Sequence, residues 1–127
     1  MQYLDAMISA VPRGNREQFL AHARMADAVF LEKGALRVVE CWGDDVPNGK
    51  LTDLRMAVKA EAEEEVVLSW IEWPDKATRD AAWADMMDPT KLDPRMDPAR
   101  NPMPFDGKRM IHGGFAPLMD LGAGDRS

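Results

Sequence analysis

Residues 66–75 decide the fold, because a strand pattern runs directly into a helix start in the stretch Val66-Val67-Leu68-Ser69-Trp70-Ile71-Glu72-Trp73-Pro74-Asp75. The β-branched and aromatic residues of 66–73 predict a strand. Pro74-Asp75 then starts a helix that ends at Asp88-Pro89. The apolar positions of this helix are Ala77, Ala81, Ala84, Met87 and, at the margin, Trp83.

The first half of the chain has the same order of strand and helix. Residues 3–11 carry apolar side chains on both faces, which indicates a central strand, and Asp5 is the exception that needs a partner or water. Residues 16–33 have a helical period between an expected N-cap at Asn15 and an expected C′ residue at Gly34. The apolar stripe of that helix is Phe19, Ala23, Ala26 and Phe30, with the charged residues Arg16, Glu17, Arg24 and Asp27 elsewhere.

Two further strand segments complete the middle of the chain. Residues 35–42 are rich in β-branched and aromatic residues and predict a strand. Residues 54–59 are predicted to pair with 66–73 as a hairpin around an acidic, solvated turn. In that register Arg55 lies near Trp70.

The C-terminal part begins with a Pro-rich loop. Residues 88–108 hold five of the nine prolines, which excludes a long helix or a central strand. Residues 109–118 form the last predicted strand, interrupted at Gly113-Gly114 by a bulge or a close backbone approach. We expect one domain over residues 1–121 and a disordered tail over 122–127.

The order of elements predicts a ferredoxin-like α+β fold, βαββαβ with an extra hairpin strand. Its antiparallel sheet would carry helices on one face only. The other face would expose an apolar patch, which is expected to pack against a partner. The simplest partner is a second copy of the chain, packed sheet to sheet. The residues expected in that patch include Val39, Cys41, Ile71, Trp73 and Ile111.

Composition excludes several classes of protein. The 127 residues carry 22 acidic and 16 basic side chains, a net charge of −6, so the attraction that drives nonspecific nucleic-acid binding is missing. One cysteine, Cys41, excludes an intramolecular disulfide and a multi-cysteine zinc module. No signal peptide and no membrane-spanning run is evident, so we expect a cytoplasmic protein.

Three strings occur in order along the chain, namely Gly34-Ala35-Leu36-Arg37-Val38-Val39-Glu40-Cys41-Trp42-Gly43-Asp44-Asp45-Val46-Pro47, Ser69-Trp70-Ile71-Glu72-Trp73-Pro74, and Met103-Pro104-Phe105-Asp106-Gly107-Lys108-Arg109-Met110-Ile111 with Gly113-Gly114-Phe115. Together they resemble the bacterial family of uncharacterised proteins called domain of unknown function 1428, the YbaA-like proteins. The resemblance runs from about Tyr3 to Leu118 and implies a dimeric α+β barrel, with no established reaction and no agreed catalytic residues. Relatives by fold include cofactor-independent monooxygenases, muconolactone-isomerase-like enzymes and haem-handling proteins, an analogy that does not imply function.

The two histidines are the candidate catalytic residues. His22 borders the apolar stripe of the first helix, where an imidazole serves as a general base or, more commonly, is bonded at the edge of the core. His112 alternates with Met110 and Gly114 beside glycines that either open a ligand pocket or, more commonly, serve packing. The two histidines form no recognisable metal motif, and we predict neither a metal nor a cofactor.

Two carboxylates and the single cysteine have open roles. Glu40 and Glu72 lie on otherwise apolar strand faces, where a dry carboxyl has the raised pKa that a general acid or base needs. The alternative is ion pairing with Arg37, Arg55 or Arg109, which we favour. Cys41 has no local activating base and is expected to behave as a small hydrophobe.

Trp42, Trp70 and Arg55 are the candidate ligand-binding residues, with the tryptophans as an aromatic wall and Arg55 to orient an anionic group. Tryptophans of this kind are more often core or dimer anchors. We therefore predict a homodimeric protein that binds a small molecule, with proton abstraction by a histidine leading to cofactor-independent oxygenation or isomerisation. The alternative is a non-enzymatic dimeric binding or interaction module, and neither hypothesis involves nucleic acid or a membrane.

Overall fold

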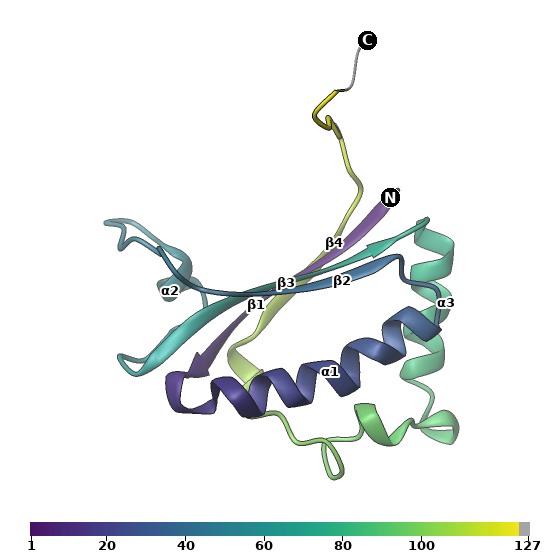
Figure 1. Cartoon of the computed structure of the whole chain (residues 1–127), viewed down its shortest axis with the longest axis horizontal. Helices are drawn as coiled ribbons and strands as arrows, with labels where there is room; N and C mark the ends of the chain where they lie inside the picture. The colour runs from purple at the N-terminus through teal and green to yellow at the C-terminus, as the bar shows by residue number, and fades with distance from the viewer. Residues whose placement is uncertain (125–127) are drawn as a thin grey trace.

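Four antiparallel strands form one sheet in the order β2-β3-β1-β4 (Figure 1). The computed structural model describes residues 1–124. This order, with β1 and β3 in the centre, confirms the ferredoxin-like α+β class. The strands are β1 (Tyr3–Pro12), β2 (Arg37–Trp42), β3 (Glu64–Trp73) and β4 (Ile111–Phe115), and the helices are α1 (Arg16–Glu32), α2 (Leu54–Ala57) and α3 (Lys76–Met86).

The two long helices cover the same face of the sheet (Figure 1). Helix α3 begins as predicted, because the side chain of Asp75 accepts a hydrogen bond from the backbone N–H of Thr78. Helix α1 is followed by Gly34, whose φ of 110° suits the predicted C′ residue. Asn15 does not cap α1 with its side chain, because its Nδ2 instead donates to the carbonyl oxygen of Pro104, 2.8 Å away.

The prediction of a hairpin between 54–59 and 66–73 is wrong, and so is the prediction of an extra strand. Asp53 accepts a hydrogen bond from the backbone N–H of Met56 and starts the short helix α2 where the fifth strand was expected. The guanidinium of Arg55 donates to the backbone carbonyl oxygens of Glu61 and Glu64. Arg55 therefore ties the turn before β3 to α2 and does not pair across a strand.

The register of the central strands decides which side chains are covered. Tyr3 pairs with Trp73 and Asp5 with Ile71, and all four lie on the face beneath the helices. Ile71 and Trp73 are completely buried there, so placing them in the exposed patch was wrong. The patch on the opposite, open face contains Leu4, Ala6, Ile8, Val39, Cys41, Leu68, Trp70, Ile111 and Phe115.

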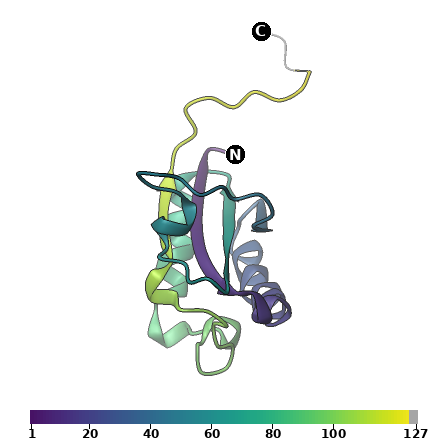
Figure 2. The ribbon, with the colours of Figure 1, turned by 90° about the vertical axis from the view of Figure 1, so that its left-hand side faces the viewer.

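The Pro-rich segment 88–108 runs from the end of α3 to the start of the last strand and lies at the lower end of the molecule in Figure 2. It consists of short turns, including 3-10 turns at Pro89–Lys91 and Pro94–Met96, as its proline content predicts. Within residues 1–124 no helix is both long and apolar enough to cross a membrane. The predicted cytoplasmic location stays a prediction, as does the disordered tail, whose residues 125–127 lie outside the described part of the chain.

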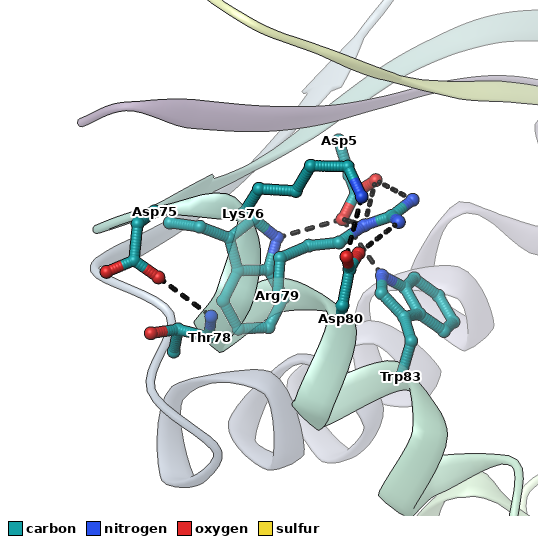
Figure 3. Close-up of polar contacts among 8 residues, drawn as sticks. Asp5, Asp75, Lys76, Thr78, Arg79, Asp80 and Trp83 are labelled. Carbon is teal, nitrogen blue, oxygen red and sulfur yellow. Dashed lines mark hydrogen bonds and ion pairs between the residues drawn. The ribbon is translucent and has the colours of Figure 1, made fainter.

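A buried carboxylate joins the sheet to α3 (Figure 3). Asp5, only 4% exposed, accepts hydrogen bonds from the indole N–H groups of Trp73 and Trp83 at 2.8 and 2.9 Å. The guanidinium of Arg79 donates to both oxygens of the same carboxylate, at 2.8 to 3.1 Å. Burial raises the pKa of Asp5, but the hydrogen bonds from Arg79, Trp83 and Trp73 outweigh it, so the pKa lies below its ordinary value.

Asp5→Asn is expected to lower the free energy of unfolding by about 3–5 kcal/mol, because the partly buried Arg79 loses its buried carboxylate and keeps only the exposed Asp80. Since the pKa of Asp5 is lowered in the folded state, its contribution is present above about pH 4 and is lost as the pH falls through the folded-state pKa. Urea titrations between pH 2 and 7 measure both effects. Asp80→Asn, at an exposed carboxyl that also contacts Arg79, is the matched control and is expected to change little. Equal losses in the two variants would contradict this role of Asp5.

Candidate functional site

A cavity of about 230 Å³ lies between α1, the helix-covered face of the sheet and the Pro-rich segment. Most of its wall is aromatic, aliphatic or thioether, which suits a small apolar molecule. The apolar lining residues are Met7, Phe19, Ala23, Ala26, Phe30, Trp83, Met96, Met103, Phe105 and Met110. The polar lining residues are Ser9, His22, Asp27, Glu40 and Ser69.

Two carboxyl groups meet in this cavity. Asp27 comes from the sheet-facing side of α1 and Glu40 from β2, and their carboxyls share a hydrogen bond. The hydroxyl of Ser69, opposite Glu40 in β3, donates to the Glu40 carboxylate. Burial first, and then the hydrogen bond and the negative charge of Glu40, raise the pKa of Asp27 to about 8. Near pH 7 the pair therefore holds one proton and one negative charge.

No cation in the described part of the chain, residues 1–124, compensates this pair. Among residues 1–124, neither Asp27 nor Glu40 takes part in an ion pair with lysine, arginine or histidine. Glu72 is different, because it lies 3.8 Å from the guanidinium of Arg37 and accepts a hydrogen bond from Trp70. The two carboxylates whose roles the sequence left open therefore differ. Glu72 is ion-paired, whereas Glu40 belongs to an acid pair inside a cavity.

His22 faces the same cavity from α1. Its Nδ1 lies 3.0 Å from Oδ1 of Asn101, which belongs to the Pro-rich segment and is 7% exposed. The ring of Phe105 stands edge to face against the imidazole, with the centroids 6.4 Å apart. The cavity therefore has an imidazole and a carboxyl pair on a mainly apolar wall.

His112 lines an adjoining cavity of about 340 Å³. This second cavity shares Met7, Trp83 and Met110 with the first, so the two hollows are neighbours beneath the same face of the sheet. His112 itself is exposed, on the helix-side face of β4. Within residues 1–124 no group of three or more histidine, cysteine or acidic side chains is placed to hold a metal ion.

The predicted ligand-binding residues do not come together. Trp42 packs against Phe19, with ring centroids 6.5 Å apart, and lines a small hollow of about 120 Å³ that also includes Glu40. Trp70 and Arg55 lie away from the cavity, because Trp70 is on the open face and Arg55 is bound to backbone carbonyls. Arg55 is therefore not available in this cavity to orient an anionic group, the role that the sequence had predicted for it.

Asp27, Ser69 and Asn101 belong to this site and were not predicted from the sequence. Asp27 was assigned to the charged side of the first helix, although it follows Ala23 by four residues and precedes Phe30 by three. That spacing places it on the edge of the apolar stripe, a signal that could have identified it. Asn101 had no such signal, because it lies in a segment without periodicity.

Sequence comparisons find relatives over most of the chain. A family model described as "Protein of unknown function (DUF1428)" matches residues 2–107. The chain is 54% identical over 120 residues to the uncharacterized protein YbaA of Escherichia coli strain K12, covering 94% of this chain and 99% of that protein. The protein of the same name in Shigella flexneri matches with the same identity and coverage.

Two solved structures share the fold at low sequence identity. One is a dimeric ferredoxin-like protein from an uncultured marine organism, 12% identical, with a TM-score of 0.57, covering 95% of this chain and 100% of that chain. The other is a mutant form of SnoaB, a cofactor-independent oxygenase from Streptomyces nogalater. It is 17% identical, with a TM-score of 0.50, covering 95% of this chain and 98% of that chain.

Asp27→Asn is expected to remove a loss of stability that the wild-type protein shows between about pH 4 and pH 8. The unfolded chain releases the Asp27 proton near pH 4, whereas the folded protein keeps it to about pH 8, so ionisation favours unfolding throughout this window. Near pH 8 the variant is expected to be more stable than the wild type by about 1–3 kcal/mol.

Urea unfolding at several pH values measures this difference. Asp44→Asn, at an exposed carboxyl, is the control and is expected to leave the pH profile unchanged. A pH profile of Asp27→Asn that is parallel to that of the wild type would mean that the Asp27 carboxyl is not protonated in the folded protein.

Proposed function

The chain belongs to the family of proteins of unknown function DUF1428, and we propose that it is a homodimeric protein that binds a small, mainly apolar, uncharged molecule and moves a proton on it. The observation that carries this proposal is the Asp27–Glu40 pair in a mainly apolar cavity whose described lining holds no lysine or arginine. Two neighbouring carboxyls destabilise a folded protein, and a pair of apolar residues of similar size would pack there at lower cost. A role in binding or proton transfer accounts for their presence.

The polar groups of the cavity suit general acid–base chemistry. His22 would accept a proton from a C–H or O–H group of the bound molecule, and the protonated carboxyl pair would donate one to a carbonyl oxygen. In such an isomerisation the C–H bond breaks and its electron pair forms a C=C bond. The π electron pair of the carbonyl moves to its oxygen, which takes the proton of the pair and becomes a hydroxyl group. His22 then releases its proton to water, and the carboxyl pair takes one back from water. The structural neighbour SnoaB is named a cofactor-independent oxygenase, which supports a reaction without a cofactor on this fold.

The negative charge of the carboxyl pair disfavours an anionic ligand. Near pH 7 the carboxyl pair carries one negative charge, so a carboxylate ligand would be repelled in a site of low dielectric constant. Arg55, which was expected to orient an anionic group, is not near the cavity. The proposed ligand is therefore uncharged at its polar end.

We expect 2-naphthol to bind in this cavity about tenfold more tightly than 2-naphthoate at pH 7, because the two probes share an apolar body and differ in charge. Chemical-shift perturbation of amide signals in two-dimensional NMR gives both affinities and the site of binding. His22→Ala is expected to weaken 2-naphthol binding, and Arg55→Ala is the matched control that lies outside the cavity. Saturable binding of 2-naphthoate at least as tight as that of 2-naphthol, or no perturbation of cavity residues by 2-naphthol, would overturn the proposal.

The open face of the sheet supports the homodimer. Leu68, Ile111 and Phe115 are 42, 43 and 56% exposed in the single chain and lie on one continuous antiparallel surface. An apolar sheet face of this kind packs well against a second copy related by a two-fold axis. The structural neighbour from the marine organism is described as a dimeric ferredoxin-like protein, which supports the same arrangement here.

The non-enzymatic interaction module is the second candidate function. The exposed sheet face favours it, because assembly alone would account for Leu68, Ile111 and Phe115. It gives no role to the Asp27–Glu40 pair, so the binding hypothesis accounts for more of the structure.

Leu68→Glu is expected to convert the dimer into a monomer, because it places a charge in the middle of the apolar face. Leu31→Glu is the matched control, since Leu31 is 50% exposed on α1, away from that face. Native mass spectrometry measures both masses. A monomeric wild type, or a dimer that survives Leu68→Glu and dissociates with Leu31→Glu, would show that the open face is not the interface.

A further inference from the structure

Asn101 is one of the few buried polar residues, and its side chain makes three hydrogen-bond contacts with two segments of the chain. Its Nδ2 donates to the backbone carbonyl oxygen of Arg95, at 2.7 Å, and to that of His22, at 3.3 Å. Its Oδ1 lies 3.0 Å from Nδ1 of His22. Asn101 thus connects the Pro-rich segment to both the backbone and the side chain of one residue of α1.

The two carbonyl oxygens determine which way the amide of Asn101 points. A carbonyl oxygen accepts and never donates, so the group that faces Arg95 and the His22 backbone must be the NH₂ group. In the reverse orientation, Oδ1 would face two other oxygens and the hydrogen bonds to both carbonyls would be lost. The oxygen of the Asn101 amide therefore faces the imidazole of His22.

This orientation determines the tautomer of His22. Since Oδ1 of Asn101 accepts only, Nδ1 of the imidazole must carry a hydrogen and donate it. In the neutral ring the other nitrogen, Nε2, then has a free lone pair. Among the residues that the structure describes, Nε2 of His22 has no hydrogen-bond partner, and the residue lines the cavity.

We propose that Asn101 is a positioning residue that holds His22 in the Nδ1–H tautomer and so makes Nε2 the proton acceptor of the cavity. The Pro-rich segment thereby contributes to the chemistry of the site although it supplies no catalytic residue. The group of the ligand that faces His22 is then an O–H, an N–H or an acidic C–H. This last consequence rests on the proposed function, whereas the tautomer itself does not.

The test is the tautomer of His22, measured by long-range ¹H–¹⁵N NMR of the imidazole ring about two pH units above the ordinary pKa of histidine. The chain has two histidines, so His112→Gln leaves His22 as the single source of ring signals. We expect a protonated Nδ1 and an unprotonated Nε2 in this background. An Nε2–H ring, or an equal mixture of tautomers, would overturn the proposal.

Two substitutions separate positioning from a merely structural role. Asn101→Ala removes the acceptor and is expected to shift the ring towards a mixture or to Nε2–H. Asn101→Asp keeps an acceptor and loses the amide donors, so it is expected to retain the Nδ1–H form even though it weakens the attachment of the segment. If Asn101→Ala does not fold, the wild-type tautomer and its persistence in Asn101→Asp still decide the question. Persistence of the Nδ1–H form in a folded Asn101→Ala would overturn the role of Asn101.

Asn15→Ala is the matched control for loss of attachment. Asn15 also joins the first turn of α1 to the same segment, through the carbonyl oxygen of Pro104, but it has no hydrogen bond to a histidine. We expect this variant to leave the tautomer unchanged. A tautomer that changes equally in Asn15→Ala and Asn101→Ala would contradict a specific role of Asn101.

Failure of the proposed function is distinguishable from failure of this inference. The NMR measurement needs no ligand, so the Nδ1–H tautomer can be found in a protein that does not bind 2-naphthol. In that case the positioning role of Asn101 stands and the assignment of the cavity falls. If the protein binds 2-naphthol but has an Nε2–H ring, the assignment of the cavity stands and the positioning role of Asn101 is contradicted.

Discussion

The carboxylate of Asp5 is the constraint on which the rest of the structure depends. It lies in the central strand β1 and is surrounded by donors, Trp73 from the neighbouring strand and Arg79 and Trp83 from α3. A buried charge is tolerated only where its hydrogen bonds are complete, so this group requires one position of α3 against the sheet. Trp83, held there, also lines both cavities beneath the sheet. The position of α3 and the shape of the candidate site therefore have a common cause.

Asp5 and Asp27, two carboxyl groups between the helices and the sheet, have opposite surroundings. Asp5 has a guanidinium and two indole N–H groups, and its pKa is lowered, whereas Asp27 has a second carboxyl, and its pKa is raised. The first arrangement stabilises a charge and serves the fold. The second keeps a proton near neutral pH at the cost of stability, which is the property expected of a binding or acid–base site. Both groups contact elements that only tertiary packing brings together.

Much of the fold could be predicted because it depends on local patterns. The strands over 3–11 and 66–73 were found from alternation and residue type, and the helix after Pro74 from its capping residue. The segment 54–59 failed because Asp53 forms a helix cap there, a local hydrogen bond that outweighed the strand pattern. Ile71 and Trp73 were assigned to the wrong face because alternation identifies two faces without telling which one the helices cover.

By itself the sequence determined the fold class, the presence of an apolar sheet face that the helices do not cover and the place of His22 beside the apolar stripe of its helix, since each follows from spacing along one element. Only the tertiary structure decided that Glu40 meets Asp27 and not an arginine, that Arg55 and Trp70 lie away from the cavity, and that Asn101 reaches His22. These contacts join residues as much as 79 positions apart, between a helix and a segment without periodicity. The spacing of residues along the sequence does not predict such pairs, because the distance between them is set by how the elements pack.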